Sequence, residues 1–134
     1  MVFVDDMYLY PMGRFRRLKC SHMIATTDDE LHAMAARIGV SRAHWQSPTK
    51  TSGSHYDIAM SKRALAINAG AIPITMKQLA AMNARRRETG ELGNPDTAIE
   101  WLQEHWASRR VEPGAAPKPN SGPAMGQQSL FEIP

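Results

Sequence analysis

The composition of the chain changes sharply at Val111, and this change limits how much of the sequence can fold. From residue 111 to 126, proline and glycine recur among alanine and polar residues, with hardly an apolar side chain to bury. Such a segment cannot offset the entropy lost on ordering and is typical of a disordered linker. The folded core must therefore come from the residues before it, which suffice for one domain.

The overall composition excludes several classes of protein. Across 134 residues, 43% are hydrophobic and 22% are charged, which is close to globular averages. No stretch approaches the roughly 18 apolar residues that span a bilayer, and no secretory signal pattern is present, so we expect a cytoplasmic protein with no membrane partner. Cys20 is the single cysteine, which excludes an internal disulfide and a cysteine-based zinc site.

The net charge of +3 hides an asymmetry along the chain. Residues up to Arg87 carry a net charge of +7, whereas residues from Glu88 onward carry −4. A basic domain attracts nucleic-acid phosphates through counterion release, although such an excess also serves solubility. Charge alone leaves both explanations open, and nucleic acid stands as a candidate partner.

Short apolar runs separated by turn residues predict the strands. Val2–Val4 is typical of a buried first strand, and the extended run at residues 19–25 can pair with it. Residues 40–46 have room for a short third strand. Residues 71–74 form another apolar run, and Pro73, which has no amide hydrogen to donate, places that run at a sheet edge.

Cap residues followed by helically spaced apolar side chains predict the helices. Thr27 and Thr75 each stand three residues before Glu or Gln, which is the capping-box pattern. The helix after Thr75 finishes in three arginines, whose charge suits a helix C-terminus. The His-Tyr-Asp triplet at 55–57 leads into another helix. Asn94, followed by proline, starts a last amphipathic helix.

These elements predict an α/β or α+β fold, in which three to four helices pack on a small, mostly short-stranded sheet and a disordered tail follows. We expect a basic α/β domain at residues 1–87. An amphipathic helix at 94–110 should pack on it, because its two tryptophans need a surface that buries them. The linker then occupies residues 111–126, and residues 127–134 form a short docking motif.

Polar side chains that a simple scaffold does not require lie at or near the ends of the expected strands. Asp5 and Asp6 follow the first strand, His22 lies in the second, and His55 and Asp57 precede a helix. If the sheet gathers the strand ends, these five residues form a candidate catalytic centre. Four of them, Asp5, His22, His55 and Asp57, would then be ligands of a divalent cation.

Lys62 and Arg63 follow this group closely and are the candidate phosphate-binding residues. Together with a metal centre they indicate a phosphodiesterase or nuclease-like site. The structural alternative is that Asp57 and Ser61 cap a helix, both histidines bond to buried backbone, and the two cations are solvated. No His-x-x-x-His, Cys-x-x-Cys or Asp-x-Asp spacing supports the metal, so both interpretations stay open.

Several short segments, in order, carry a resemblance to a known family. They are Val4-Asp5-Asp6, Ser21 to Ala25, Asp29 to His32, Arg37-Ile38-Gly39, His55 to Ile58, and Ser61-Lys62-Arg63 through Gly70-Ala71. In these segments the chain resembles the bacterial and phage family called domain of unknown function 4031 (DUF4031). The resemblance implies a bacterial or phage origin, and it brings no established activity. The last helix and the tail lie outside it.

Residues 127–134 read Gln-Gln-Ser-Leu-Phe-Glu-Ile-Pro. A Leu-Phe pair on a tether stabilises a complex by about 3 to 6 kcal/mol if it docks in an apolar groove. The peptide resembles the sliding-clamp-binding motif of bacterial replication and repair proteins, Gln-Leu-Ser/Asp-Leu-Phe. Gln127, Ser129, Leu130 and Phe131 match it, and the second position has glutamine in place of leucine. The resemblance implies that Gln127 enters a polar pocket while Leu130 and Phe131 fill a groove between two clamp domains.

Two functions from different classes follow. In the first, the chain is a DNA-metabolism accessory protein that the tail recruits to the clamp and whose basic domain contacts nucleic acid. In the second, it is a small enzyme that uses the His/Asp cluster and a divalent metal on phosphate-containing substrates. The tail has its own alternative, because Leu130, Phe131 and Ile133 could instead pack on the parent domain.

Overall fold

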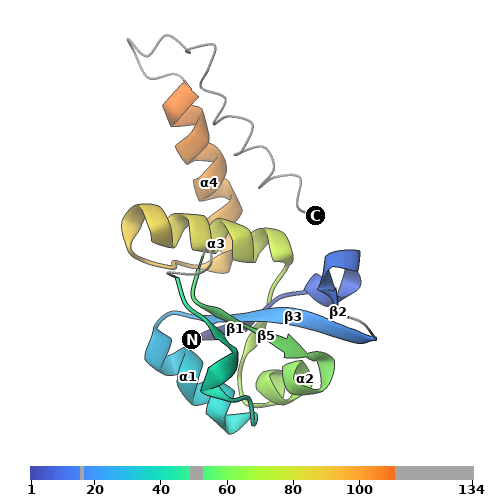
Figure 1. The fold of residues 1–134 in the computed structure, drawn as a ribbon. Helices are drawn as coiled ribbons and strands as arrows, with labels where there is room; N and C mark the ends of the chain where they lie inside the picture. Colours follow the sequence, from blue (N-terminus) through green and yellow to red (C-terminus); the bar gives the residue numbers. More distant parts are fainter. Residues whose placement is uncertain (16, 49–52, 111–134) are drawn as a thin grey trace.

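A computed structural model describes residues 1–15, 17–48 and 53–110 (Figure 1). The expected combination of short strands with four helices is confirmed, as an α+β fold. The strands are β1 (Val2–Val4), β2 (Arg14–Phe15), β3 (Leu18–Ala25), β4 (Trp45–Gln46), β5 (His55–Ala59) and β6 (Ile72–Pro73). The helices are α1 (Asp28–Arg37), α2 (Met60–Asn68), α3 (Met76–Thr89) and α4 (Pro95–Arg110), with 3-10 turns at Met7–Leu9, Pro11–Gly13 and Arg42–His44.

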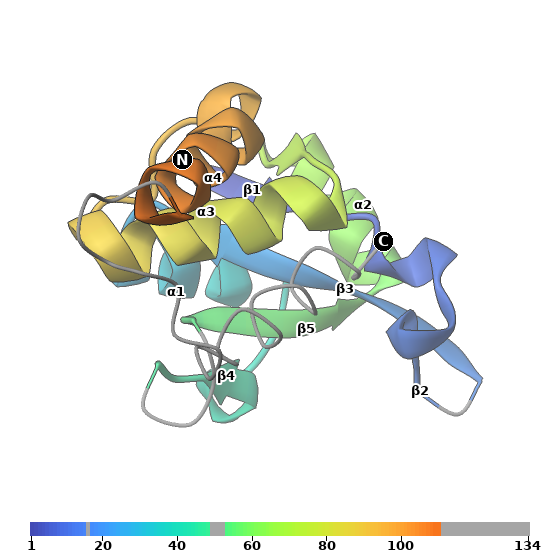
Figure 2. The same cartoon turned by 90° about the horizontal axis from the view of Figure 1, so that it is seen from above.

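The strands form a mixed sheet in the order β4-β5-β3-β1-β6. The β1–β6 pair is parallel, and the other pairs are antiparallel. Strand β3 is long enough to pair with β1 and β5 and, at its other end, with the short β2 (Figure 2). Strand β6 lies at the end of the sheet order, where Pro73 needs no further partner.

Helices cover both faces of the sheet, α1 and α2 on one and α3 and α4 on the other (Figure 1). Because side chains alternate along a strand, β1 and β3 contribute to both cores. Val4 and Met23 pack with Leu31 of α1, whereas Phe3 and Ile24 belong to the core beneath α3. The side chains of His22, His55 and Asp57, described below, are on this second face.

Helix α4 packs on α3 rather than directly on the sheet (Figure 1). Leu102 and Trp106 of α4 are buried in the same core as Met82 of α3. Trp101 is half-buried and stacks on His105, with ring centroids 4.9 Å apart. No helix in the described part of the chain is long and apolar enough to cross a membrane.

The two threonine caps differ in detail. At Thr75 the capping box is complete, because its hydroxyl accepts from the Gln78 amide and the Gln78 side chain accepts from the Thr75 amide. At Thr27 only the first of these two hydrogen bonds forms, in which the Thr27 hydroxyl accepts from the Glu30 amide. The Glu30 carboxylate binds the Met1 ammonium instead, since β1 brings that charge close to the start of α1.

Two predicted segments need correction. Of the strand expected at residues 40–46, only Trp45–Gln46 is extended, because Ser41 caps a 3-10 turn just before it. Residues 55–57, taken as the approach to a helix, belong to strand β5, which spans His55–Ala59. Helix α2 begins at Met60 with no side-chain cap at its N-terminus, so the alternative role of Asp57 as a helix cap is wrong.

Candidate functional site

Strand β5 places two of the predicted site residues on one face. It pairs with β3 on one side and with β4 on the other. Tyr56 and Ile58 are buried in the core with α1 and α2. Because side chains alternate along a strand, His55 and Asp57 point to the opposite face, where α3 lies.

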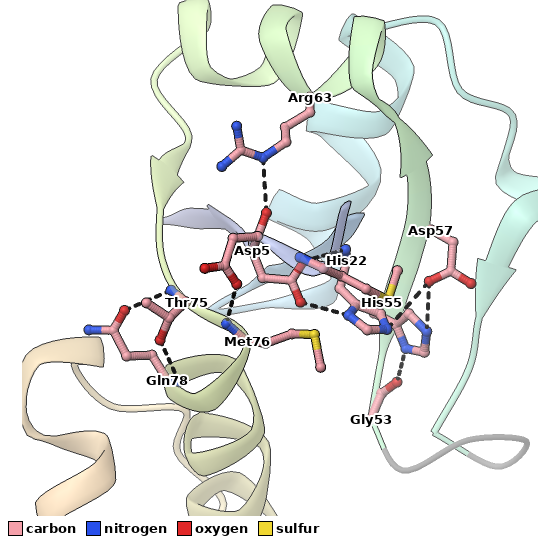
Figure 3. Close-up of polar contacts among 11 residues, drawn as sticks. Asp5, His22, Gly53, His55, Asp57, Arg63, Thr75, Met76 and Gln78 are labelled. Carbon is pink, nitrogen blue, oxygen red and sulfur yellow. Dashed lines mark hydrogen bonds and ion pairs between the residues drawn. The ribbon is translucent and has the colours of Figure 1, made fainter. Parts of the chain in front are cut away.

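Strand register brings a third and a fourth predicted residue to the same place (Figure 3). His22 of β3 lies directly opposite Asp57 of β5. The backbone amide of Asp5, one residue past β1, donates to the carbonyl of His22. Asp5, His22, His55 and Asp57 therefore come together from three neighbouring strands.

Both imidazoles direct the same ring nitrogen toward one carboxylate. Nε2 of His22 lies 3.7 Å from Oδ1 of Asp57, and Nε2 of His55 lies 3.5 Å from it. The two rings meet edge to face, with centroids 5.1 Å apart. One ligand atom from each of the three residues lies within 4.8 Å of the others, so these three side chains could hold a metal ion.

The two separations from Asp57 are close to those around a single cation. Two atoms bound at ~2.1 Å to one ion at the tetrahedral angle lie about 3.4 Å apart. The distances of 3.5 and 3.7 Å are within a few tenths of an ångström of this value. Three protein ligands also leave coordination positions open for water or substrate, which is the arrangement of catalytic metal sites.

Asp5 hydrogen-bonds to one of the candidate ligands, His22. Its side chain is fully buried, and Oδ1 accepts from the amides of Met7 and His22 at 3.1 and 2.8 Å. Oδ2 lies 2.7 Å from Nδ1 of His22. Since a carboxylate only accepts, Nδ1 carries a proton, which leaves Nε2 as the ring nitrogen that can offer a lone pair to the site. Asp5 was predicted as a metal ligand, but protein donors occupy both of its oxygens.

A backbone carbonyl orients the second imidazole in the same way. Nδ1 of His55 lies 2.7 Å from the carbonyl oxygen of Gly53 (Figure 3). A carbonyl accepts only, so this nitrogen also carries the proton and Nε2 is the free ligand atom. Both histidines thus have the second partner that metal-binding histidines usually have.

The Gly53–Ser54 segment that supplies this carbonyl is held from two sides. Trp45 donates its indole N–H to the Ser54 hydroxyl at 2.8 Å. From α3, Arg86 donates to the Ser54 carbonyl at 3.5 Å and to the Asn83 side chain at 3.0 Å. A Cβ at Gly53 would come within 2.8 Å of that Asn83 side chain. A side chain at this position would therefore displace Asn83, which is itself hydrogen-bonded to Arg86.

Charges within the cluster shift two pKa values in opposite directions. Burial lowers the pKa of His55, but Asp57, the Gly53 carbonyl and the charge of Asp5 outweigh burial, and the pKa lies above its ordinary value. The interaction with His55 lowers the pKa of Asp57 despite burial, and the charge of His22 adds to this. Without a metal, the ring of His55 therefore keeps its second proton to a higher pH than an ordinary histidine, and a binding cation competes with that proton.

Asp6, predicted as part of the catalytic group, does not join the cluster. Its carboxylate accepts from the amide of Met76 at 2.8 Å. Met76 is the first residue of α3, where helix geometry leaves amides without an internal partner. Asp6 thus complements the Thr75 cap and ties the end of β1 to α3.

The two predicted phosphate-binding residues have different surroundings. Nε of Arg63 donates to the Asp5 carbonyl at 2.9 Å, and its guanidinium carbon lies 4.8 Å from the centre of the Tyr8 ring. Arg63 therefore supports the backbone of Asp5. Lys62 is half-buried and lines a groove next to Asp57. The predicted clamp-binding residues, Gln127, Ser129, Leu130 and Phe131, lie outside the described residues.

The fold and cluster define a small α+β domain with a His/Asp centre on one face of its sheet. The chain belongs to the DUF4031 family of proteins of unknown function, which matches residues 2–86. This match confirms the family resemblance and extends it to α3, while α4 lies beyond it. Searches of curated proteins and of solved structures gave no match.

Proposed function

We propose that this chain is a divalent-metal-dependent hydrolase that acts on phosphate esters of nucleotides or nucleic acid. The proposal is carried by the convergence of Nε2 of His22, Nε2 of His55 and Oδ1 of Asp57. A purely structural pair of histidines needs no such convergence. Here each ring also has its other nitrogen tied to an acceptor, as metal-binding histidines do.

The charge around the cluster supports an anionic substrate. Arg14 and Lys62 line the groove that reaches Asp57. Within the described ranges, neither cation has an ion-pair partner. Phosphate esters carry the negative charge that such unpaired cations attract.

Each side chain has a separate part in the proposed reaction. A cation held by the three ligands would supply an activated water and polarise a phosphoryl oxygen. Asp5 keeps the lone pair of His22 directed at the site, and the Gly53 carbonyl does the same for His55. The Asp57 side chain is 47% exposed, so the site is open to solvent and substrate on that side.

The test is hydrolysis of bis(p-nitrophenyl) phosphate with Mn²⁺, Zn²⁺ or Mg²⁺. We expect activity that EDTA removes and that His55→Ala lowers by on the order of 100-fold or more, because two ligands do not hold the cation firmly. His105→Ala, in α4 and outside the cluster, is the matched control and should keep its activity. No hydrolysis with any of these metals, or equal rates for His55→Ala and wild type, would refute the proposal.

We also propose that residues 127–134 dock on a bacterial sliding clamp and so recruit the enzyme to DNA. The support is sequence alone, namely the four matching residues after a Pro/Gly-rich tether. In a pull-down with purified clamp, the full chain should be captured, and the double variant Leu130→Ala/Phe131→Ala should not. Lys118→Ala, in the tether, is the control. Equal capture of all three proteins contradicts this recruitment.

A further inference from the structure

A groove of about 670 Å³ opens beside the His/Asp cluster. On the side of β5 away from β3, β4 pairs only with His55 and Tyr56. Beyond that pairing, Asp57, Ile58 and Ala59 line the groove. Asp57 therefore belongs both to the cluster and to the groove wall, and a molecule in the groove would lie next to the candidate metal ligand.

Two cationic side chains line the groove. Lys62 and Arg14 both line it and, in residues 1–15, 17–48 and 53–110, neither is neutralised by a carboxylate. The Lys62 ammonium lies close to Gly39, where an added Cβ would come within 3.2 Å of Nζ. Two cations against the single carboxylate of Asp57 favour an anionic ligand.

Large apolar side chains also line the groove. Met7 is buried beneath it, while Met12 and Leu18 are 55% and 57% exposed. Large apolar side chains that remain exposed in a groove are typical of a binding site. Methionine sulfur is polarisable and makes favourable contacts with flat aromatic rings, which suits a nucleobase.

We infer that this groove binds a nucleoside monophosphate unit, with its phosphate near Lys62 and Asp57 and its base against Met12 and Leu18. The volume lies within the roughly 300 to 1,000 Å³ of small-molecule sites. The inference names the substrate class of the proposed hydrolase and rests on that function for the reaction. The binding itself rests on the charge and lining of the groove.

The test is isothermal titration of the full chain with AMP, adenosine and inorganic phosphate in the presence of Mn²⁺. AMP should bind at least about tenfold more tightly than either fragment, because it engages both the cationic and the apolar side chains of the groove. Lys62→Ala should raise the Kd for AMP by on the order of tenfold and leave adenosine unchanged. Met12→Ser and Leu18→Ser should weaken AMP and adenosine but not phosphate.

Matched controls lie at exposed positions outside the groove. Lys77→Ala and Leu65→Ser should bind AMP like the wild type. An oligonucleotide with a 5′ phosphate tests whether the groove takes a free nucleotide or the end of a nucleic-acid strand. If the oligonucleotide binds more tightly than AMP and its binding also depends on Lys62, the ligand is a strand end. Equal binding indicates a free nucleotide.

The inference is overturned if AMP binds no better than phosphate, or if Lys62→Ala binds AMP like the wild type. Metal-induced stabilisation without AMP binding overturns the groove assignment and leaves the metal centre of the proposed hydrolase intact. AMP binding that depends on Lys62, in a protein that shows no response to metal, supports the groove assignment and refutes the proposed metal chemistry.

Discussion

Zinc or manganese at about 100 times its Kd is expected to raise the Tm of the EDTA-stripped wild-type chain by roughly 10 °C. A ligand that binds only the folded state adds about 2.7 kcal/mol at this excess. A domain of this size gains roughly 4 °C per kcal/mol. The cation would join β3 to β5 through His22, His55 and Asp57. His55→Ala should abolish the shift in thermal unfolding followed by circular dichroism, because only two ligands remain.

The pH provides an independent check on this shift. The pKa of His55 lies above its ordinary value in the metal-free protein, so the ring stays protonated to a higher pH than usual. Since only the deprotonated ring binds metal, the Tm shift should shrink as the pH falls from about 8 to about 6. A shift that is equal in wild type and His55→Ala, or that does not change with pH, counts against the cluster as the binding site.

Local signals predicted the elements that local interactions stabilise. The complete capping box at Thr75 could be recognised because its partners are three residues apart. Pro73 indicated an edge strand because its missing amide hydrogen is a property of the residue itself. Strand β5 was missed because its alternation rests on two buried residues, Tyr56 and Ile58, which is too short a pattern to distinguish a strand from the start of a helix.

For the candidate site, residue types could be named from the sequence, but their roles could not. Asp5 and Asp6 are adjacent carboxylates with the same local signal, yet one orients His22 and the other caps α3. Their partners come from segments far along the chain, and no local pattern encodes them.

The role of Arg86 also could not be predicted from the sequence. The sequence showed Arg86 only as one of three arginines whose charge suits the C-terminus of a helix. In the structure its guanidinium donates to the carbonyls of Ala25 and Ser54, and burial lowers its pKa. The contact holds the segment that orients His55, and it depends on how α3 lies across the sheet.

Asp5→Ala is expected to lower the free energy of unfolding by about 3 to 5 kcal/mol, as measured by urea denaturation. The substitution leaves the buried amides of Met7 and His22 and the ring N–H of His22 without their common acceptor. Asp6→Ala is the matched control, because it removes a carboxylate next in sequence that accepts only the Met76 amide. It should cost about 1 kcal/mol, as other helix caps do. If the two variants lost the same free energy of unfolding, Asp5 would not be the common acceptor on which these three donors depend.

Asp5→Asn separates the orienting role of this residue from its structural one, and it should weaken zinc binding by on the order of 10- to 100-fold. An asparagine whose oxygen continues to accept from the Met7 and His22 amides must present its NH₂ group to Nδ1 of His22. That group only donates, so the ring must move its proton to Nε2, the atom that faces Asp57. Nitrogen NMR of the histidine rings reports this change of tautomer directly, and calorimetry gives the zinc affinity. If the variant keeps its proton on Nδ1 and binds zinc like the wild type, Asp5 has no orienting role. A variant that is merely less stable would lower the Tm without moving the proton, because packing alone does not select a tautomer.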